Sequence, residues 1–254
     1  MKNLGLTEDG SPHLEFEGGA NALLDYLHGA AHNTSQSYHR LREECVFFGE
    51  ITRLFDLLRA VSEGIEGERL LALNLASKAQ SCAFVAMRVA MAGQPSEAAT
   101  LTRTCIESSL YAWHMGRGTP EEVTARTEVY QRRHRSESDR AAARTMYGHP
   151  TRLIETLEEA DEALCRETKR VYERTIDEGA HPNQMAVTPF ITMRLDGPIT
   201  YSRYAVMVSE APVIQAGVRR VLHGTLVGLT ICAYAFKDRF KNPVEAAQMQ
   251  DSLN

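Results

Sequence analysis

Apolar positions recur every three or four residues along most of the chain, which is the spacing of an amphipathic α-helix. Between residues 38 and 63 the spacing is set by six apolar side chains: Leu41, Cys45, Phe48, Ile51, Phe55 and Leu58. Glycines, prolines and short polar segments separate such stretches. The pattern predicts helices at seven places: residues 19–31, 38–63, 68–92, 96–115, 121–146, 151–178 and 210–240.

Several helix ends carry their own signals. Ser96 precedes an alanine-rich stretch and suits the N-cap position, and Pro120 opens the next helix. Gly179 is the kind of residue found just past a helix end. Pro182 disfavours the helical conformation at His181. We therefore expect the helix of residues 151–178 to stop at Gly179 and to leave His181 just beyond its end.

The period changes at residues 187–204, where β-branched and aromatic residues surround the dipeptide Asp196-Gly197, a hairpin turn signal. The fold class predicted from these elements is mainly α. It is a single helical bundle of about six to seven helices, with a small β-hairpin insertion near 187–204. Residues 1–18 are expected to form an irregular N-terminal segment, and residues 19–254 one domain, because no repeat or composition shift marks a second.

Composition places the chain among soluble globular proteins. It has 254 residues, of which 43% are hydrophobic and 24% charged, with a formal net charge of −5. This charge argues against bulk electrostatic binding of nucleic acid, although a local basic patch can still bind it. The start of the chain lacks the apolar core of a signal peptide, and the apolar run 224–236 is too short to span a bilayer. We expect a cytoplasmic protein without a membrane segment.

The five cysteines are far apart and include no CxxC pair, which favours neither a zinc site nor a disulfide framework. Most of them are expected to be small buried residues. The HExxH motif, Gly-rich phosphate loops, the nucleophile elbow and the paired Glu-x-x-His motifs of di-iron bundles are also absent. No metal and no cofactor is predicted.

Three polar residues share one face of the helix predicted at 96–115. Arg103 and Glu107 are four residues apart, and His114 follows seven residues later. Their neighbours are mostly apolar, and buried charges need partners. Two interpretations stay open: a structural Arg103–Glu107 pair that fixes helix packing, or a buried polar cluster that lines a pocket.

Arg174 and His181 form a second candidate site. Seven positions along a helix return to nearly the same face about 10.5 Å further on, and a chain that folds back after Gly179 shortens this gap. An imidazole gains and loses protons near neutral pH, and a guanidinium stabilises charge on phosphate. Such a pair suffices to cleave RNA without metal. The alternative is a helix end followed by a polar loop.

The stretch QRRHRSESDRAAAR, residues 131–144, is the third feature. It holds five arginines against Glu137 and Asp139, a local net charge of +3. A basic helix face of this kind can follow a phosphate backbone, and we expect Arg132, Arg133 and Arg135 to bind RNA. Alternatively, the arginines form a solvated face that pairs with the acidic residues at 155–162.

The stretch from about 70 to 115 contains SKAQSCAFVAMRVAMAGQPSEAATLTRTCIESSLYAWH. It resembles an uncharacterised family of prokaryotic helical proteins with a small-residue helix, a Gly turn, an Ala-rich helix start, and an Arg and a Glu four residues apart. In that family a His before a hairpin-like segment follows, as GAHPN does here. The family is similar to the HEPN superfamily (higher eukaryotes and prokaryotes nucleotide-binding), and the resemblance covers residues 40–240.

The resemblance implies a HEPN-like helical bundle that is often a homodimer. In catalytic members an Arg and a His with four to six residues between them form a ribonuclease site at the dimer interface. Arg174 and His181 have six residues between them, but Thr175 follows the Arg where catalytic members usually carry Asn, Asp or His.

We therefore expect a HEPN-like protein that binds RNA or nucleotide and cleaves RNA without metal, in a toxin or defence setting. Two alternatives stay open: a non-catalytic dimeric interaction or scaffold module, and a small-molecule pocket protein built around Arg103, Glu107 and His114. No motif for sequence-specific DNA binding is present.

Overall fold

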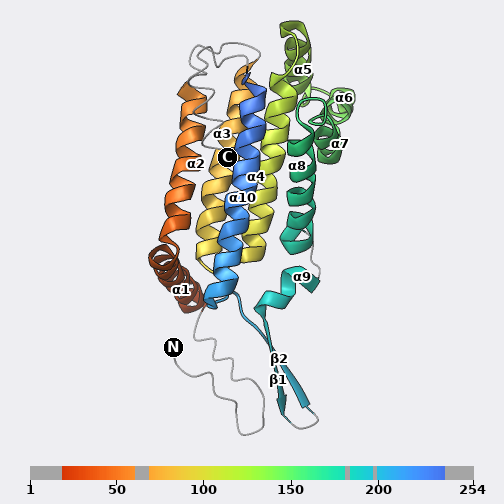
Figure 1. Ribbon diagram of the computed structural model, residues 1–254. Helices are drawn as coiled ribbons and strands as arrows, with labels where there is room; N and C mark the ends of the chain where they lie inside the picture. Colours follow the sequence, from red (N-terminus) through yellow and green to blue (C-terminus); the bar gives the residue numbers. More distant parts are fainter. Residues whose placement is uncertain (1–18, 61–68, 181–183, 197–198, 238–254) are drawn as a thin grey trace.

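The computed structural model describes residues 19–60, 69–180, 184–196 and 199–237. These residues form a bundle of long helices from which shorter elements project (Figure 1). The helices and strands, in chain order, are α1 Gly19–Arg40, α2 Arg42–Ala60, α3 Leu70–Met91, α4 Pro95–Gly116, α5 Pro120–Arg132, α6 Glu137–Tyr147, α7 Pro150–Glu155, α8 Glu162–Thr175, a π-helix Ile176–Ala180, α9 Gln184–Val187, a 3-10 helix Thr188–Phe190, β1 Ile191–Asp196, β2 Ile199–Tyr204 and α10 Ala211–Ala235. The predicted mainly helical bundle is confirmed.

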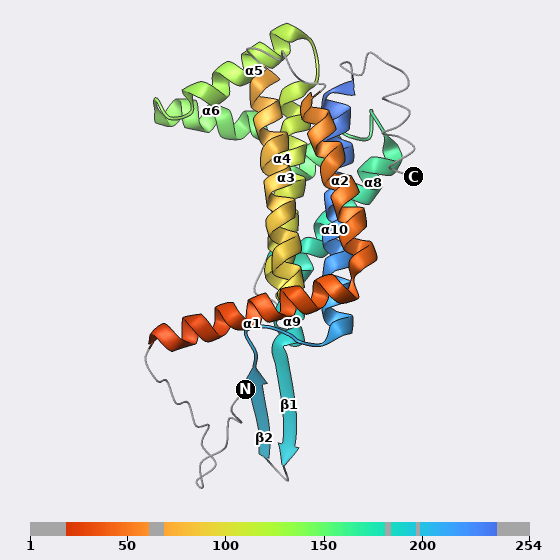
Figure 2. The same cartoon turned by 90° about the vertical axis from the view of Figure 1, so that its left-hand side faces the viewer.

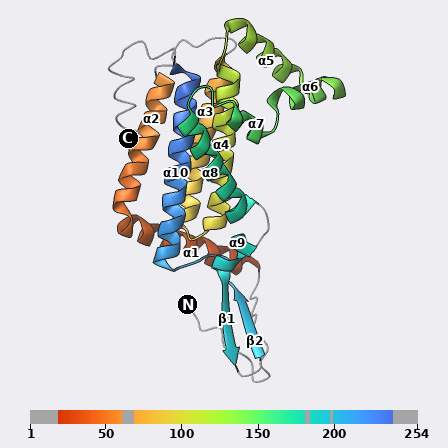
Figure 3. The ribbon, with the colours of Figure 1, turned by 45° about the vertical axis from the view of Figure 1, so that its right-hand side comes forward.

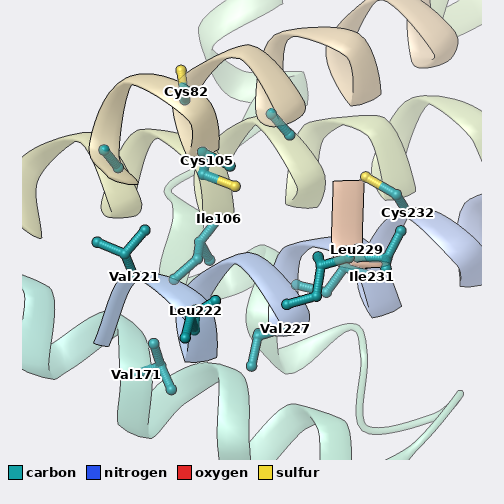
Figure 4. Packing of buried hydrophobic residues seen from close by; sticks show 14 of the residues in the cluster. Cys82, Cys105, Ile106, Val171, Val221, Leu222, Val227, Leu229, Ile231 and Cys232 are labelled. Atoms are coloured by element: carbon teal, nitrogen blue, oxygen red, sulfur yellow. The ribbon is translucent and has the colours of Figure 1, made fainter. Parts of the chain in front are cut away.

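Three helices, α3, α4 and α10, form the centre of the bundle, with α2 on one side and α8 on the other (Figure 1). Small residues let their backbones approach closely. On α10, a Cβ at Gly224 would overlap the side chain of Thr102, and one at Gly228 would lie 2.9 Å from Ser109 Oγ. The glycines of the run 224–236 are therefore required by packing against α4. Figure 4 shows the side chains that fill the adjoining core, including Ile106, Val221 and Leu229.

The cysteines belong mainly to this core. Cys82, Cys105 and Cys232 are buried, Cys45 and Cys165 are half-buried, and all five are free thiols. Burial raises the pKa of Cys232 to about 12 and the pKa of Cys105 well above its ordinary value. These buried thiols are neutral and act as small apolar residues.

The chain has more helices than the six to seven expected, because two predicted helices are interrupted. Residues 121–146 divide into α5 and α6, and Ser136 caps α6 by accepting a hydrogen bond from the Asp139 amide (3.0 Å). Residues 151–178 divide into α7 and α8, and Asp161 caps α8 through the Leu164 amide (2.9 Å). Side-chain oxygens that satisfy free amides in this way start new helices inside both predicted ranges.

Two other predicted boundaries differ. α1 continues to Arg40 rather than ending near residue 31. Ser96 is not the N-cap of α4: Gln94 holds that position, and the Ser96 hydroxyl donates to the carbonyl of Ala186 (2.8 Å). The Ser96 side chain, which was predicted to cap the helix, therefore makes a tertiary hydrogen bond instead.

Strands β1 and β2 pair antiparallel, with Ile191 opposite Tyr204 and Asp196 opposite Ile199. Figure 2 shows this pair projecting from one end of the bundle, beside α1. The strands begin later than the expected residue 187, because α9 and the 3-10 helix occupy residues 184–190. The turn was predicted at Asp196-Gly197, and residues 197 and 198 lie outside the described residues.

Among the described helices, α3 is long and apolar enough, by length and composition, to cross a membrane. The core helix of a globular bundle meets the same criteria. Ten residues of α3, most of them alanines, are buried. Burial explains part of this composition, whereas Leu70, Phe84 and Val85 of the same helix are exposed.

Candidate functional site

A cleft of about 540 Å³ lies between the α5–α6 pair and the central helices α3 and α4. Figure 3 shows α5 and α6 extending away from the bundle at the end of α4 that leads into them. The uncharged lining is buried or half-buried and comes from Leu75, Tyr111, Tyr130, Ala143 and Gly148. The remaining lining is basic and mostly exposed: Arg133, His134, Arg140 and Arg144.

The break between α5 and α6 creates this arrangement. α5 ends at Arg132, the Arg135 amide donates to the Arg132 carbonyl (2.8 Å), and α6 starts after the Ser136 cap. The chain thereby reverses, and α6 packs against α5. Arg140 and Arg144 are four residues apart on α6 and therefore share the face that borders the cleft.

The described residues that line the cleft give it a strongly positive character and include no acidic side chain. Among the described residues, no carboxylate pairs with Arg133, Arg140 or Arg144. Some arginines elsewhere are paired, as Arg219 is with Glu44 (3.0 Å), whereas others, such as Arg88 and Arg152, have no carboxylate partner among the described residues. The cations of the cleft are thus free to meet an anionic ligand.

Arg133 has a defined position inside the cleft. Its guanidinium lies over the ring of Tyr130, 3.5 Å from the ring centroid, and its Nη1 donates to the Tyr130 carbonyl (2.8 Å). The cation–π contact and the hydrogen bond together hold the guanidinium plane against the ring. On the central side of the cleft, burial and then the nearby Glu107 raise the pKa of Tyr111 above its ordinary value.

The three arginines predicted to bind RNA therefore differ in position. Arg133 lines the cleft, whereas Arg132 and Arg135 are exposed outside its lining. Arg132 is paired with Glu128 within α5 (2.9 Å). Among the described residues, no ion pair joins the basic stretch 131–144 to the acidic residues at 155–162. The described residues thus lack the pairing of that alternative, whereas the exposure of Arg132, Arg135, Arg140 and Arg144 agrees with its solvated face.

Arg103 and Glu107 meet a third residue that the sequence did not indicate. Arg103 Nε donates to Glu107 Oε1 (2.8 Å) and its Nη2 donates to the Tyr172 hydroxyl (3.0 Å). That hydroxyl in turn donates to Glu107 Oε1 (2.8 Å). Burial, and then the hydrogen bond to Glu107, raise the pKa of Tyr172 to about 12. This closed triad joins α4 to α8, which agrees with a structural role for the Arg103–Glu107 pair.

His114 lies apart from this triad. Burial, followed by the charges of Arg126 and Arg117, lowers the pKa of His114 to about 4, and a hydrogen bond to the Met146 backbone opposes the shift. The imidazole is therefore neutral at pH 7 and faces α5 and α6. Of the three residues predicted to form one polar cluster, the structure brings together only Arg103 and Glu107.

Arg174 lies in the last turn of α8, and His181 lies outside the described residues. Arg174 Nε is 3.9 Å from Glu178 Oε1, and Arg220 Nε of α10 is 3.2 Å from the same oxygen. The two arginine side chains are 45% and 43% exposed, whereas Glu178 is only 18% exposed. Arg174, Glu178 and Arg220 line a small cleft. His223 borders this cleft too, and it pairs with Glu167.

Gly179 does not end a helix in a left-handed conformation, because α8 continues into the π-helix Ile176–Ala180. A Cβ at this position would overlap the carbonyl oxygen of Ser96, at the start of α4. The hydroxyl of Thr100 also donates to the Gly179 carbonyl (3.0 Å). Glycine is thus required here by close backbone contact. A π-helical turn often marks a functional position, and Arg174 lies next to this turn.

The two clefts lie towards different ends of α4. Ala99 borders the small cleft lined by Arg174, and Tyr111 borders the basic cleft, which is the one lined by Arg133, Arg140 and Arg144. Ala99 and Tyr111 are twelve residues apart on α4, which corresponds to about 18 Å along the helix axis. The residues predicted for catalysis and for RNA binding do not form one continuous site. Sequence reasoning missed Tyr111, Tyr130 and Tyr172, since an isolated tyrosine in a helical pattern carries no signal of its own.

Within the described part of the chain, no group of three or more His, Cys, Asp or Glu side chains is placed to hold a metal ion. Comparison of the chain with protein-family models, curated proteins and solved structures gives no match in any of the three. The geometry of the chain itself is therefore the basis for assigning a function.

Proposed function

We propose that the protein binds RNA or a nucleotide in the cleft between α5–α6 and α3–α4. One observation carries this proposal: Arg133, Arg140 and Arg144 border a single cleft, and no carboxylate in the described chain pairs with them. Unpaired arginines repel one another, and a bound phosphate relieves that repulsion while it accepts forked hydrogen bonds. The tyrosine rings beside them suit the base of a nucleotide.

Loss of the cleft's charge tests this proposal. Binding of a short fluorescent single-stranded RNA is measured by anisotropy at salt concentrations between about 50 and 200 mM. The double substitution Arg140→Gln with Arg144→Gln is expected to weaken binding and to reduce the salt dependence by about two phosphate contacts. The matched control is Arg59→Gln with Arg166→Gln, which removes the same charge from exposed ion-paired residues outside the cleft and outside the stretch 131–144. Equal losses in both proteins would refute the proposal.

RNA cleavage without metal, in a toxin or defence setting, is a second proposal. It is favoured by the half-exposed Arg174, which lies at a π-helical turn beside Arg220. In this reaction the ribose 2′-oxygen attacks phosphorus and the bond to the 5′-oxygen breaks, which gives a cyclic phosphate and a free hydroxyl. His181 would move the proton and Arg174 would stabilise the phosphate charge.

The test of cleavage is a gel assay of purified protein with RNA in EDTA, comparing wild type with Arg174→Ala and His181→Ala. Loss of cleavage in both variants supports the pair. An RNA panel left intact by wild type instead supports the non-catalytic dimeric module. A homodimer, to be measured by light scattering, is part of both proposals. A small-molecule pocket at Arg103, Glu107 and His114 has weaker support, since two of these residues are satisfied within the triad.

A further inference from the structure

We propose that the basic cleft accepts an unpaired nucleotide, and that the base lies against the guanidinium of Arg133 where this is stacked on Tyr130. This inference rests on the proposed function of the cleft and specifies its ligand. The ligand class is a base with at least one phosphate, supplied either as a free nucleotide or as one residue of a single strand.

The stack of Arg133 on Tyr130 is the first observation. A guanidinium 3.5 Å from the ring centroid already uses one of its faces on the tyrosine, and its Nη1 is fixed by the Tyr130 carbonyl. Arg133 is half-buried and borders the cleft. Nucleobases stack on arginine planes as they do on aromatic rings. A base that enters the cleft can therefore stack on the other face of the Arg133 guanidinium, so that the guanidinium lies between the ring of Tyr130 and the base.

The second observation is that the lining has an uncharged part and a basic part. Leu75, Ala143 and the ring of Tyr111 form a lining that is buried or half-buried, whereas Arg140 and Arg144 are exposed. A base suits the uncharged lining, and its phosphate suits the exposed cations. Phosphate alone would leave the uncharged lining without a partner.

The size of the cleft is the third observation. Its volume of about 540 Å³ falls within the range of pockets that hold one small ligand, roughly 300–1,000 Å³. The bases of an RNA duplex are stacked and paired inside the helix, and its narrow major groove admits no side chains. A duplex could offer only phosphates and sugar hydroxyls to the exposed arginines. Single-stranded or free nucleotides satisfy both parts of the lining.

The experiment compares four probes on the full chain by anisotropy or competition: a labelled single strand, its blunt duplex, the same strand with abasic sites, and unlabelled AMP. The single strand is expected to bind roughly 5- to 100-fold more tightly than the abasic strand, the range typical of base stacking. The duplex is expected to bind as weakly as the abasic strand. Competition by AMP indicates a free-nucleotide site, and competition by RNA alone indicates a strand; both outcomes support an unpaired base.

Arg133→Lys is the decisive variant, because it keeps the positive charge but removes the planar group. It should lose the preference for the single strand over the abasic strand and keep the salt dependence of wild type. Tyr130→Leu should lose the same preference, and a thermal melt verifies that each variant is folded. Equal binding of single, abasic and duplex RNA, still weakened by Arg140→Gln with Arg144→Gln, would overturn this inference and leave the proposed function standing. Failure of every probe to bind wild type overturns both.

Discussion

The carboxylate of Glu178 lies 3.2 Å from the guanidinium of Arg220, which joins the π-helix after α8 to the central helix α10. Glu178 is mostly buried, and burial raises its pKa, although Arg220 and Arg174 partly offset the shift. This carboxyl therefore binds its proton more tightly in the folded chain than in the unfolded chain. Its ionisation costs folding free energy in spite of two neighbouring arginines.

The Glu178→Gln variant is expected to gain stability relative to wild type as the pH rises. Where the folded pKa exceeds the unfolded pKa, the folded state binds more protons, so wild-type stability falls as pH increases through that interval. Glutamine cannot ionise and lacks this loss. Urea unfolding of both proteins at pH 4 and pH 7 measures the difference. If the variant is less stable than wild type at pH 7, the ion pairs of Glu178 stabilise the fold by more than the burial of its carboxylate costs.

Gly179→Ala should be strongly destabilising. The new Cβ would overlap the carbonyl oxygen of Ser96, which belongs to backbone and cannot rotate away, so we expect a loss of about 1–3 kcal/mol. Gly49→Ala in α2 is the matched control, because a Cβ there meets nothing within 4 Å. That control should gain about 0.5–1 kcal/mol from helix propensity. Denaturant midpoints of the two variants should thus move in opposite directions, and a shared direction would contradict the close contact.

Tyr172→Phe should lower stability by about 1.5–3 kcal/mol, because it removes a hydrogen bond to the charged Glu107 and leaves Arg103 without its second acceptor. Tyr38→Phe removes the hydroxyl of an exposed tyrosine and serves as control, with an expected change within about 0.5 kcal/mol. Both values come from urea unfolding at pH 7. Equal effects would argue against the triad as a link between α4 and α8.

His114 should titrate near pH 4 in the folded protein, because burial and the adjacent arginines disfavour its charged form. The unfolded chain binds this proton at higher pH, so the contribution of the neutral imidazole to stability is lost as the pH falls from about 6.5 to about 4. NMR titration of the His114 ring protons measures the midpoint. His114→Gln should flatten the acid loss of stability over the same interval, and a midpoint near 6.5 would place the ring in solvent.

Local periodicity determined the helical class and the central helices. The ranges predicted for α3 and α4 agree with the structure within about two residues at each end, because the spacing of small and apolar residues is a property of consecutive positions. The sequence also indicated the basic stretch 131–144 and the Arg103–Glu107 pair, since each is local. The predicted ranges did not include the helix starts at Ser136 and Asp161, although both are residue types that favour the N-cap position.

Only the tertiary structure decided which distant residues meet. Tyr172 bonds to Glu107, 65 residues earlier in the chain, and Tyr111 borders the same cleft as Arg140 and Arg144 of α6. Gly179 resembles a helix stop in the sequence, yet its small size is required by the start of α4. Helix formation depends on neighbours three and four residues away, whereas a cleft depends on how whole helices pack. The sequence therefore determined the helical class, the central helices and the local charges, and packing decided which residues form a site.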